Sequence, residues 1–148
     1  MDEKKFKEII KFAIDKEIKS YNFYTKASNV AKYSGAKDLF SDLAKEEVGH
    51  RKMLEKLDMK KIAKAKIEKV PDLKISTYLT DTVFKPDMPY ANILRMAIKM
   101  EERALKLYNN LNKSNKDEKL NKLFTLLANE EAKHKLRLEK IYDDEILK

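Results

Sequence analysis

The chain has 148 residues, enough for one domain with a substantial core, and it contains no cysteine, which excludes disulfides, thiolate metal sites and cysteine nucleophiles. Only 2 glycines and 3 prolines accompany abundant Lys, Glu, Leu and Ala, a composition that favours helices over a loop-rich or β-rich fold. The net charge of +8 comes from lysines spread over every segment instead of one stripe, which disfavours a nucleic-acid partner.

The first helix is predicted from about residue 4 to about residue 32. One face repeats at the 3–4 spacing of a buried helical stripe. Glu17 is the charged member of that stripe, and a carboxylate on a core face must be paired, protonated or bound to a metal. Ser34–Gly35 is predicted to stop the helix through a C-terminal glycine cap. The stripe comprises Phe6, Ile10, Ala13, Glu17, Ser20 or Tyr21, Tyr24, Ala27 and Ala31.

The second helix is predicted from Ala36 to the low 60s, and its apolar stripe is interrupted by Glu47 and His50. These residues lie at positions i and i+3, one turn apart on the same face, where both can hold one metal ion. Glu46 lies about 100° round the helix from Glu47 and is interpreted as a surface residue. Gly49 fits close packing, but the site does not require glycine there, because Lys133 takes the equivalent place in the repeat described below.

Residues 65–90 break this pattern and contain all three prolines, which predicts a long crossover connection with a short helix at Leu73–Asp81. A third helix is predicted over 90–112, where Glu101, and not its neighbour Glu102, interrupts the apolar stripe. A polar turn separates it from a fourth helix over 118–144, whose stripe contains Glu131 and His134.

The two halves of the chain repeat at an offset of 84 residues. This offset relates Leu43–His50 to Leu127–His134 and pairs Glu17 with Glu101 and Tyr24 with Tyr108. The repeat predicts an all-α fold, a four-helix bundle made of two helical hairpins joined by a long crossover, in a single domain over residues 1–148.

In such a bundle four carboxylates and two imidazoles would converge. One Glu-x-x-His in a Lys/Glu-rich helix is common by chance. Here the motif is doubled, each copy is preceded by a glutamate on a core stripe, and the chain's 2 histidines both belong to it. Oxygen and imidazole donors suit Fe(II), Mn(II) and Zn(II), and four carboxylates offset two divalent cations. The predicted ligands are Glu17, Glu47, His50, Glu101, Glu131 and His134.

These motifs resemble a ferritin-like di-iron carboxylate protein of the rubrerythrin type, over both hairpins. The resemblance implies that two iron ions are bridged by Glu47 and Glu131, with Glu17 and Glu101 as terminal ligands and one histidine on each metal. It also implies an oxidoreductase that uses O₂ or hydrogen peroxide, either in oxidative-stress defence or as a ferroxidase, and a homodimer.

The chain departs from that family in two respects. It has no cysteine-rich rubredoxin-like domain, so electrons are expected from an external donor protein or from Fe(II) itself. The additional ligand glutamate of peroxide-reducing members is replaced by Ile98 and Ala104, one turn before and after Glu101, which weakens the peroxidase assignment. The alternatives are a non-catalytic metal-binding or iron-handling bundle and a metal-free helical interaction module.

Tyr24 and Tyr108 follow Glu17 and Glu101 by seven residues on the same stripes. One interpretation is aromatic core packing. The other is a catalytic role, either as a hydrogen-bond donor to a ligand carboxylate or as a redox-active tyrosine. The N-terminus has no signal-peptide pattern and no apolar stretch is long enough to span a membrane, so a cytoplasmic protein is expected.

Overall fold

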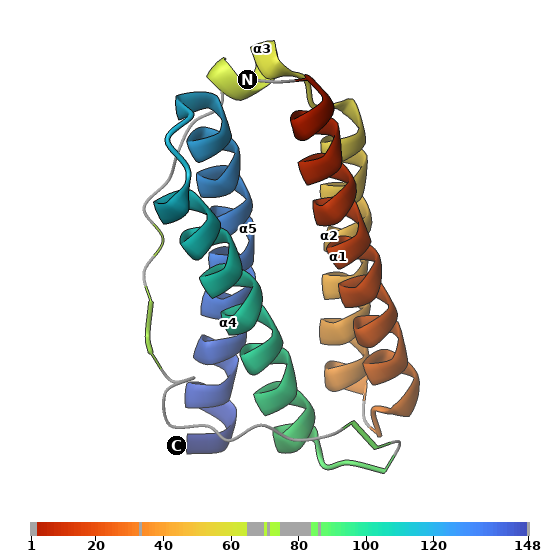
Figure 1. Cartoon of the computed structure of the whole chain (residues 1–148). Helices are drawn as coiled ribbons and strands as arrows, with labels where there is room; N and C mark the ends of the chain where they lie inside the picture. Colours follow the sequence, from red (N-terminus) through yellow and green to blue (C-terminus); the bar gives the residue numbers. More distant parts are fainter. Residues whose placement is uncertain are drawn as a thin grey trace. The chain divides into compact units, whose positions relative to one another are not determined.

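The computed structural model describes residues 3–32, 34–64, 70, 72–74, 84–85 and 87–147, and no strand occurs among them. The all-α prediction is confirmed. The helices, coloured along the chain in Figure 1, are α1 (Glu3–Val30), α2 (Ser34–Lys56), α3 (Met59–Lys64), α4 (Tyr90–Ser114), α5 (Glu118–Tyr142) and the short π-helix η2 (Asp143–Leu147).

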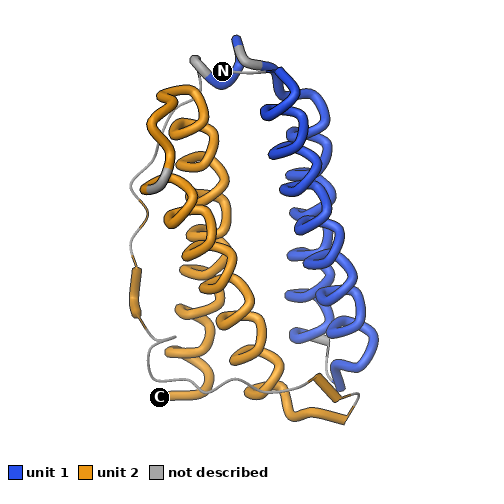
Figure 2. The backbone as a smooth tube through the Cα atoms, in the orientation of Figure 1, with its two compact units in different colours: residues 1–62 blue, residues 63–148 orange. Residues whose placement is uncertain are grey.

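The chain divides into two compact units, residues 1–62 and 63–148 (Figure 2). Helices α1 and α2 pack side by side in the first unit and are called hairpin 1 here. Helices α4 and α5 pack in the same way in the second unit and are called hairpin 2. The prediction of two helical hairpins joined by a long connection is therefore confirmed, whereas a single domain over 1–148 stays a prediction.

The turn of hairpin 1 differs from the predicted glycine cap. Helix α1 ends at Val30, where the Ala31 N–H donates to the Ala27 carbonyl at 3.0 Å. Gly35 lies in the first turn of α2, and no described glycine has a positive φ. The Ser28 hydroxyl instead donates to the Lys37 carbonyl across the turn, at 3.2 Å.

The second predicted helix is interrupted. Helix α2 ends at Lys56, and α3 begins at Met59. Between them the Asp58 carboxylate accepts the Lys61 N–H at 2.8 Å, the bond typical of an aspartate at a helix N-cap. Apolar periodicity continues through this region, so the stripe alone does not reveal the break.

The predicted helix over Leu73–Asp81 is wrong at its start. Leu73 and Lys74 are not helical, and Lys74 has a φ of 57°, in the left-handed region. Its N–H donates to the Asp72 carboxylate at 2.8 Å, which stabilises a local turn. Residues 75–81 lie outside the described residues.

Hairpin 2 begins and ends close to the predicted positions. Pro89 precedes α4, and Asp117 caps α5 by accepting the N–H groups of Lys119 and Leu120. Two side-chain hydrogen bonds fix the register of α4 against α5 toward their ends. Arg95 donates to the Tyr142 hydroxyl at 3.1 Å, and the Asn112 amide donates to the Thr125 hydroxyl at 3.0 Å.

Within the described ranges, no helix combines the length and the apolar character required to cross a membrane. The cytoplasmic localisation itself stays a prediction.

Candidate metal centre

Hairpin 2 brings three of the predicted ligands together. Glu101 comes from the middle of α4, while Glu131 and His134 come from α5, where the i, i+3 spacing places them on one face. All three side chains are buried. His134 Nδ1 lies 3.4 Å from Glu101 Oε1, and one ligand atom from each residue lies within 4.8 Å of the others. This distance is short enough for the three side chains to share one metal ion.

Hairpin 1 repeats the arrangement with a looser geometry. Glu17 comes from α1, and Glu47 and His50 come from α2. Both glutamates are buried, but the His50 side chain is 17% exposed, against 4% for His134. His50 Nδ1 lies 3.7 Å from Glu17 Oε2. Among the described residues, hairpin 1 by itself does not bring three such side chains within the 4.8 Å found in hairpin 2.

The donor chemistry of both halves fits a divalent cation. Each half presents two carboxylates and one imidazole, and a buried carboxylate is costly unless a cation or hydrogen bonds compensate its charge. Oxygen and nitrogen donors of this kind bind Fe(II), Mn(II) and Zn(II). The assignment of the six residues as ligands, and the meeting of the two halves around one pair of metals, stay predictions.

Both predicted catalytic tyrosines are fully buried. The Tyr24 ring stacks on Phe40 with centroids 6.3 Å apart and meets Phe23 edge-on at 5.4 Å. These contacts support the packing interpretation for Tyr24. Tyr108 occupies the equivalent position on α4. A catalytic role for either hydroxyl stays a prediction.

Several side chains around the ligands clarify the interpretation of the motif. Glu46 is exposed, as predicted. Gly49 is also exposed, and a Cβ added there meets no described atom within 4 Å, so close packing does not explain this glycine. The positions one turn before and after Glu101 hold Ile98 and Ala104, which are buried and carry no carboxylate.

Hairpin 2 contains an ion-pair cluster around a buried lysine, which the sequence pattern did not predict. Lys135 is only 2% exposed and its ammonium contacts three carboxylates. Its Nζ lies 3.1 Å from Glu102 Oε2 on α4 and 3.2 Å from Glu139 Oε1 one turn along α5, and it donates to Asp72 of the connection. The i, i+4 spacing of Lys135 and Glu139 indicates an ion pair. It does not indicate that the pair is buried, because the equivalent pair Arg51–Glu55 in hairpin 1 has the same spacing and is about half exposed.

Lys135 and Asp72 stabilise each other's charged form. Desolvation acts to lower the pKa of Lys135, but the hydrogen bonds to Asp72 and Glu102 and the charge of Glu139 outweigh it and hold that pKa above its usual value. For Asp72, desolvation acts to raise the pKa, and the bonds from Lys135 and the Lys74 N–H outweigh it and lower that pKa. Lys135 is therefore an ammonium at neutral pH, and its interactions compensate the cost of burying it.

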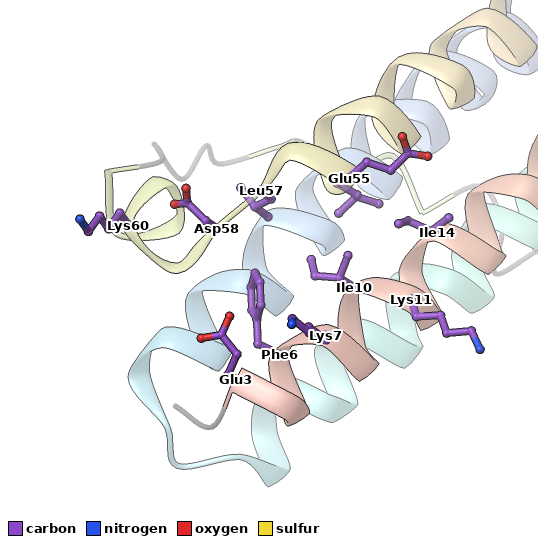
Figure 3. Close-up of a pocket in the computed structure, with 11 residues that line it drawn as sticks. Glu3, Phe6, Lys7, Ile10, Lys11, Ile14, Glu55, Leu57, Asp58 and Lys60 are labelled. Carbon is purple, nitrogen blue, oxygen red and sulfur yellow. The ribbon is translucent and has the colours of Figure 1, made fainter.

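The first unit also contains a cavity of about 620 Å³ near the start of α1 and the end of α2 (Figure 3). The side chains of Phe6, Ile10 and Leu57 line it, and charged residues such as Glu3 and Lys60 also border it. None of the predicted metal ligands lines this cavity. The cavity is therefore separate from the candidate metal centre.

Comparison with known proteins shows the family to which the chain belongs. A family model described as Rubrerythrin matches residues 2–83 and 92–147. A solved structure, "Hypothetical Protein Pfu-1136390-001 From Pyrococcus furiosus", is 26% identical with a TM-score of 0.59 and aligns over 93% of this chain and 88% of its own. No curated protein matches the chain. Because the family model covers well over half of its residues, the chain belongs to the rubrerythrin family.

Proposed function

We propose that this chain is a di-iron oxidoreductase acting on O₂ or hydrogen peroxide, with Glu17, Glu47, His50, Glu101, Glu131 and His134 as the metal ligands. The observation that carries the proposal is the three-residue group Glu101, Glu131 and His134 within hairpin 2, together with its sequence repeat in hairpin 1. Membership of the rubrerythrin family supports iron as the metal. Manganese and zinc fit the same donors.

The residues have distinct roles in this proposal. The six ligands would hold two Fe(II) ions, which would supply two electrons; with two protons, these would reduce O₂ to hydrogen peroxide or hydrogen peroxide to two waters. Glu47 and Glu131, at the centre of the two motifs, would bridge the metals. Glu17 and Glu101 would each bind one metal beside a histidine, as the short Glu–His distances in each hairpin support.

The source of electrons and the choice of oxidant follow from what these 148 residues contain. Without cysteine they supply no thiolate-bound iron centre, so the electrons for re-reduction must come from outside these residues, or Fe(II) is itself the substrate being oxidised. Ile98 and Ala104 leave no carboxylate one turn from Glu101, which favours O₂ over peroxide as the oxidant.

Anaerobic loading with Fe(II), followed by metal analysis, tests the proposal. Two iron ions per chain are expected, and rapid mixing with O₂ or with peroxide should then produce ferric absorption, faster with O₂. Glu131→Gln should lose iron, whereas Glu130→Gln, the adjacent carboxylate, should not. Tight binding of two ions without reaction with either oxidant would indicate a non-catalytic iron-handling protein. If iron, manganese and zinc all fail to bind, the site itself is wrong.

A further inference from the structure

We propose that Lys135 is a positioning residue that, through Glu102, holds α4 and α5 so that hairpin 2 carries a preformed metal site and takes up the first metal ion. This inference rests on the proposed metal-binding function and adds an order of loading to it.

The ion pair and the ligand pair occupy the same level of hairpin 2. Glu102 directly follows Glu101 on α4, and Lys135 directly follows His134 on α5. The 3.1 Å contact between Lys135 and Glu102 therefore spans the same two helices as the 3.4 Å contact between His134 and Glu101. A slide or rotation of one helix would break both contacts, so the ion pair resists the movement that would separate the ligands.

The cluster is anchored on more than one element. Lys135 also contacts Glu139 on its own helix and Asp72 of the connection, and both Lys135 and Glu139 are buried. An ion pair shielded from water is stronger than an exposed one and is weakened less by salt. The register of α4 and α5 is further fixed toward their ends by the Arg95–Tyr142 and Asn112–Thr125 hydrogen bonds.

The Lys135–Glu102 ion pair is not repeated at the equivalent positions of hairpin 1, both of which are among the described residues. The residue at the position of Glu102 is Ile18, which carries no charge, and Arg51 replaces Lys135. Arg51 pairs with Glu55 on its own helix at 3.0 Å, and both side chains are about half exposed. The difference accompanies the looser ligand set of hairpin 1, where His50 is more exposed and lies farther from its glutamate.

Preformed ligands bind a metal more tightly because less conformational freedom is lost on binding. Residues that orient metal ligands typically affect metal affinity by about 10- to 100-fold when they are changed. We therefore expect hairpin 2 to bind the first metal about 10-fold more tightly than hairpin 1. Replacing Glu102 with Ile, the residue that hairpin 1 has at this position, should remove most of that difference.

The two histidines allow a direct test, because each hairpin contains one. Protein labelled with ¹⁵N-histidine is titrated with Zn(II), and the imidazole nitrogen resonances, assigned with His50→Gln, are followed by NMR. With a difference of about 10-fold in affinity, about three quarters of the His134 signal but only about a quarter of the His50 signal should be that of the bound form at half saturation. In Glu102→Ile both sets should shift together. Arg51→Gln, which breaks the exposed pair of hairpin 1, should keep the order of the unmodified protein.

The outcomes separate this inference from the proposed function. Shifts of both histidines in parallel in the unmodified protein, or of His50 first, would overturn the loading order while leaving metal binding intact. If zinc shifts the signals of neither histidine, the loading order is overturned, and the anaerobic Fe(II) loading described above decides whether the proposed function fails as well. If Glu102→Ile does not fold by circular dichroism, Glu102→Gln, which keeps the size of the side chain, takes its place. An unchanged order in the folded variant would exclude the role of Lys135 and Glu102.

Discussion

Lys135 Nζ lies 3.1 Å from Glu102 Oε2, and each residue directly follows a predicted metal ligand along the chain. The same pair of helices therefore carries a structural ion pair and a candidate metal site in adjacent positions. A substitution at either residue can therefore change both the stability of the fold and the affinity for metal. Stability must be measured in metal-free protein, and metal binding must be measured in variants that are shown to be folded.

Replacing Lys135 should destabilise the chain far more than replacing its repeat equivalent Arg51. Lys135→Met removes a cation from beside the buried Glu139 carboxylate, and removal of one partner from a buried ion pair typically costs about 3–5 kcal/mol. Arg51→Met breaks an exposed pair, for which about 1 kcal/mol or less is expected. Urea unfolding of chelator-treated protein measures both values. Equal losses would show that Lys135 is not shielded from water.

Neutralising a predicted bridging glutamate should abolish metal binding and leave the fold intact. Glu47→Gln and Glu131→Gln keep the shape of the side chain but remove the charge that compensates a divalent cation. The matched control is Glu46→Gln, which changes the exposed neighbour of Glu47 on the same helix. Metal content after dialysis and the unfolding midpoint of the metal-free protein are measured together. A glutamine variant that retains two metal ions would remove that residue from the ligand set.

Both helical hairpins could be predicted from the sequence. The repeat and the 3–4 spacing located both hairpins, because burial of an apolar face dictates the helical period. They also selected Glu101 over Glu102, and Glu101 is the one that contacts His134. A charged residue on an otherwise apolar stripe has few satisfactory environments, which made these positions informative.

The same repeat concealed the role of Lys135. Its equivalent Arg51 is exposed, and a lysine in a Lys/Glu-rich helix is usually on the surface. Burial of Lys135 depends on Glu102 and on Asp72, which is far away in the sequence. The helix break at Asp58 was missed for a local reason, because a capping aspartate within a continuing apolar pattern resembles an ordinary polar position.

Removing the Asp72 carboxylate should have an effect that depends on pH. The pKa of Asp72 in the folded chain lies below its ordinary value of 3.8, because the bonds from Lys135 and the Lys74 N–H outweigh desolvation. A lowered folded pKa contributes stability that is present above pH 3.8 and is lost as the pH falls through the folded pKa. The difference in unfolding free energy between the unmodified protein and Asp72→Asn should therefore be largest above about pH 5 and shrink in acid.

The magnitude for Asp72 should be modest, about 1 kcal/mol or less, because its side chain is 45% exposed and screened by solvent. The control is Asp72→Asn made in a Lys135→Met background, where most of the pH-dependent difference should disappear. Persistence of the full difference in that background would assign the effect to the local turn with Lys74 instead of the ion pair.

Gly49→Ala should stabilise the protein by about 1 kcal/mol, because glycine in a helix interior is less favourable than alanine by that amount. Gly49 lies inside α2, has no positive φ and is exposed, and an added Cβ meets no described atom within 4 Å. The substitution therefore reduces the conformational freedom of the unfolded chain without creating a clash. Urea unfolding of the metal-free protein measures the gain.

The reverse change at the repeat position, Lys133→Gly on α5, should destabilise the protein by a similar amount. A loss of stability in Gly49→Ala would show that this face is closely packed after all, and a loss of metal binding as well would place that contact beside His50.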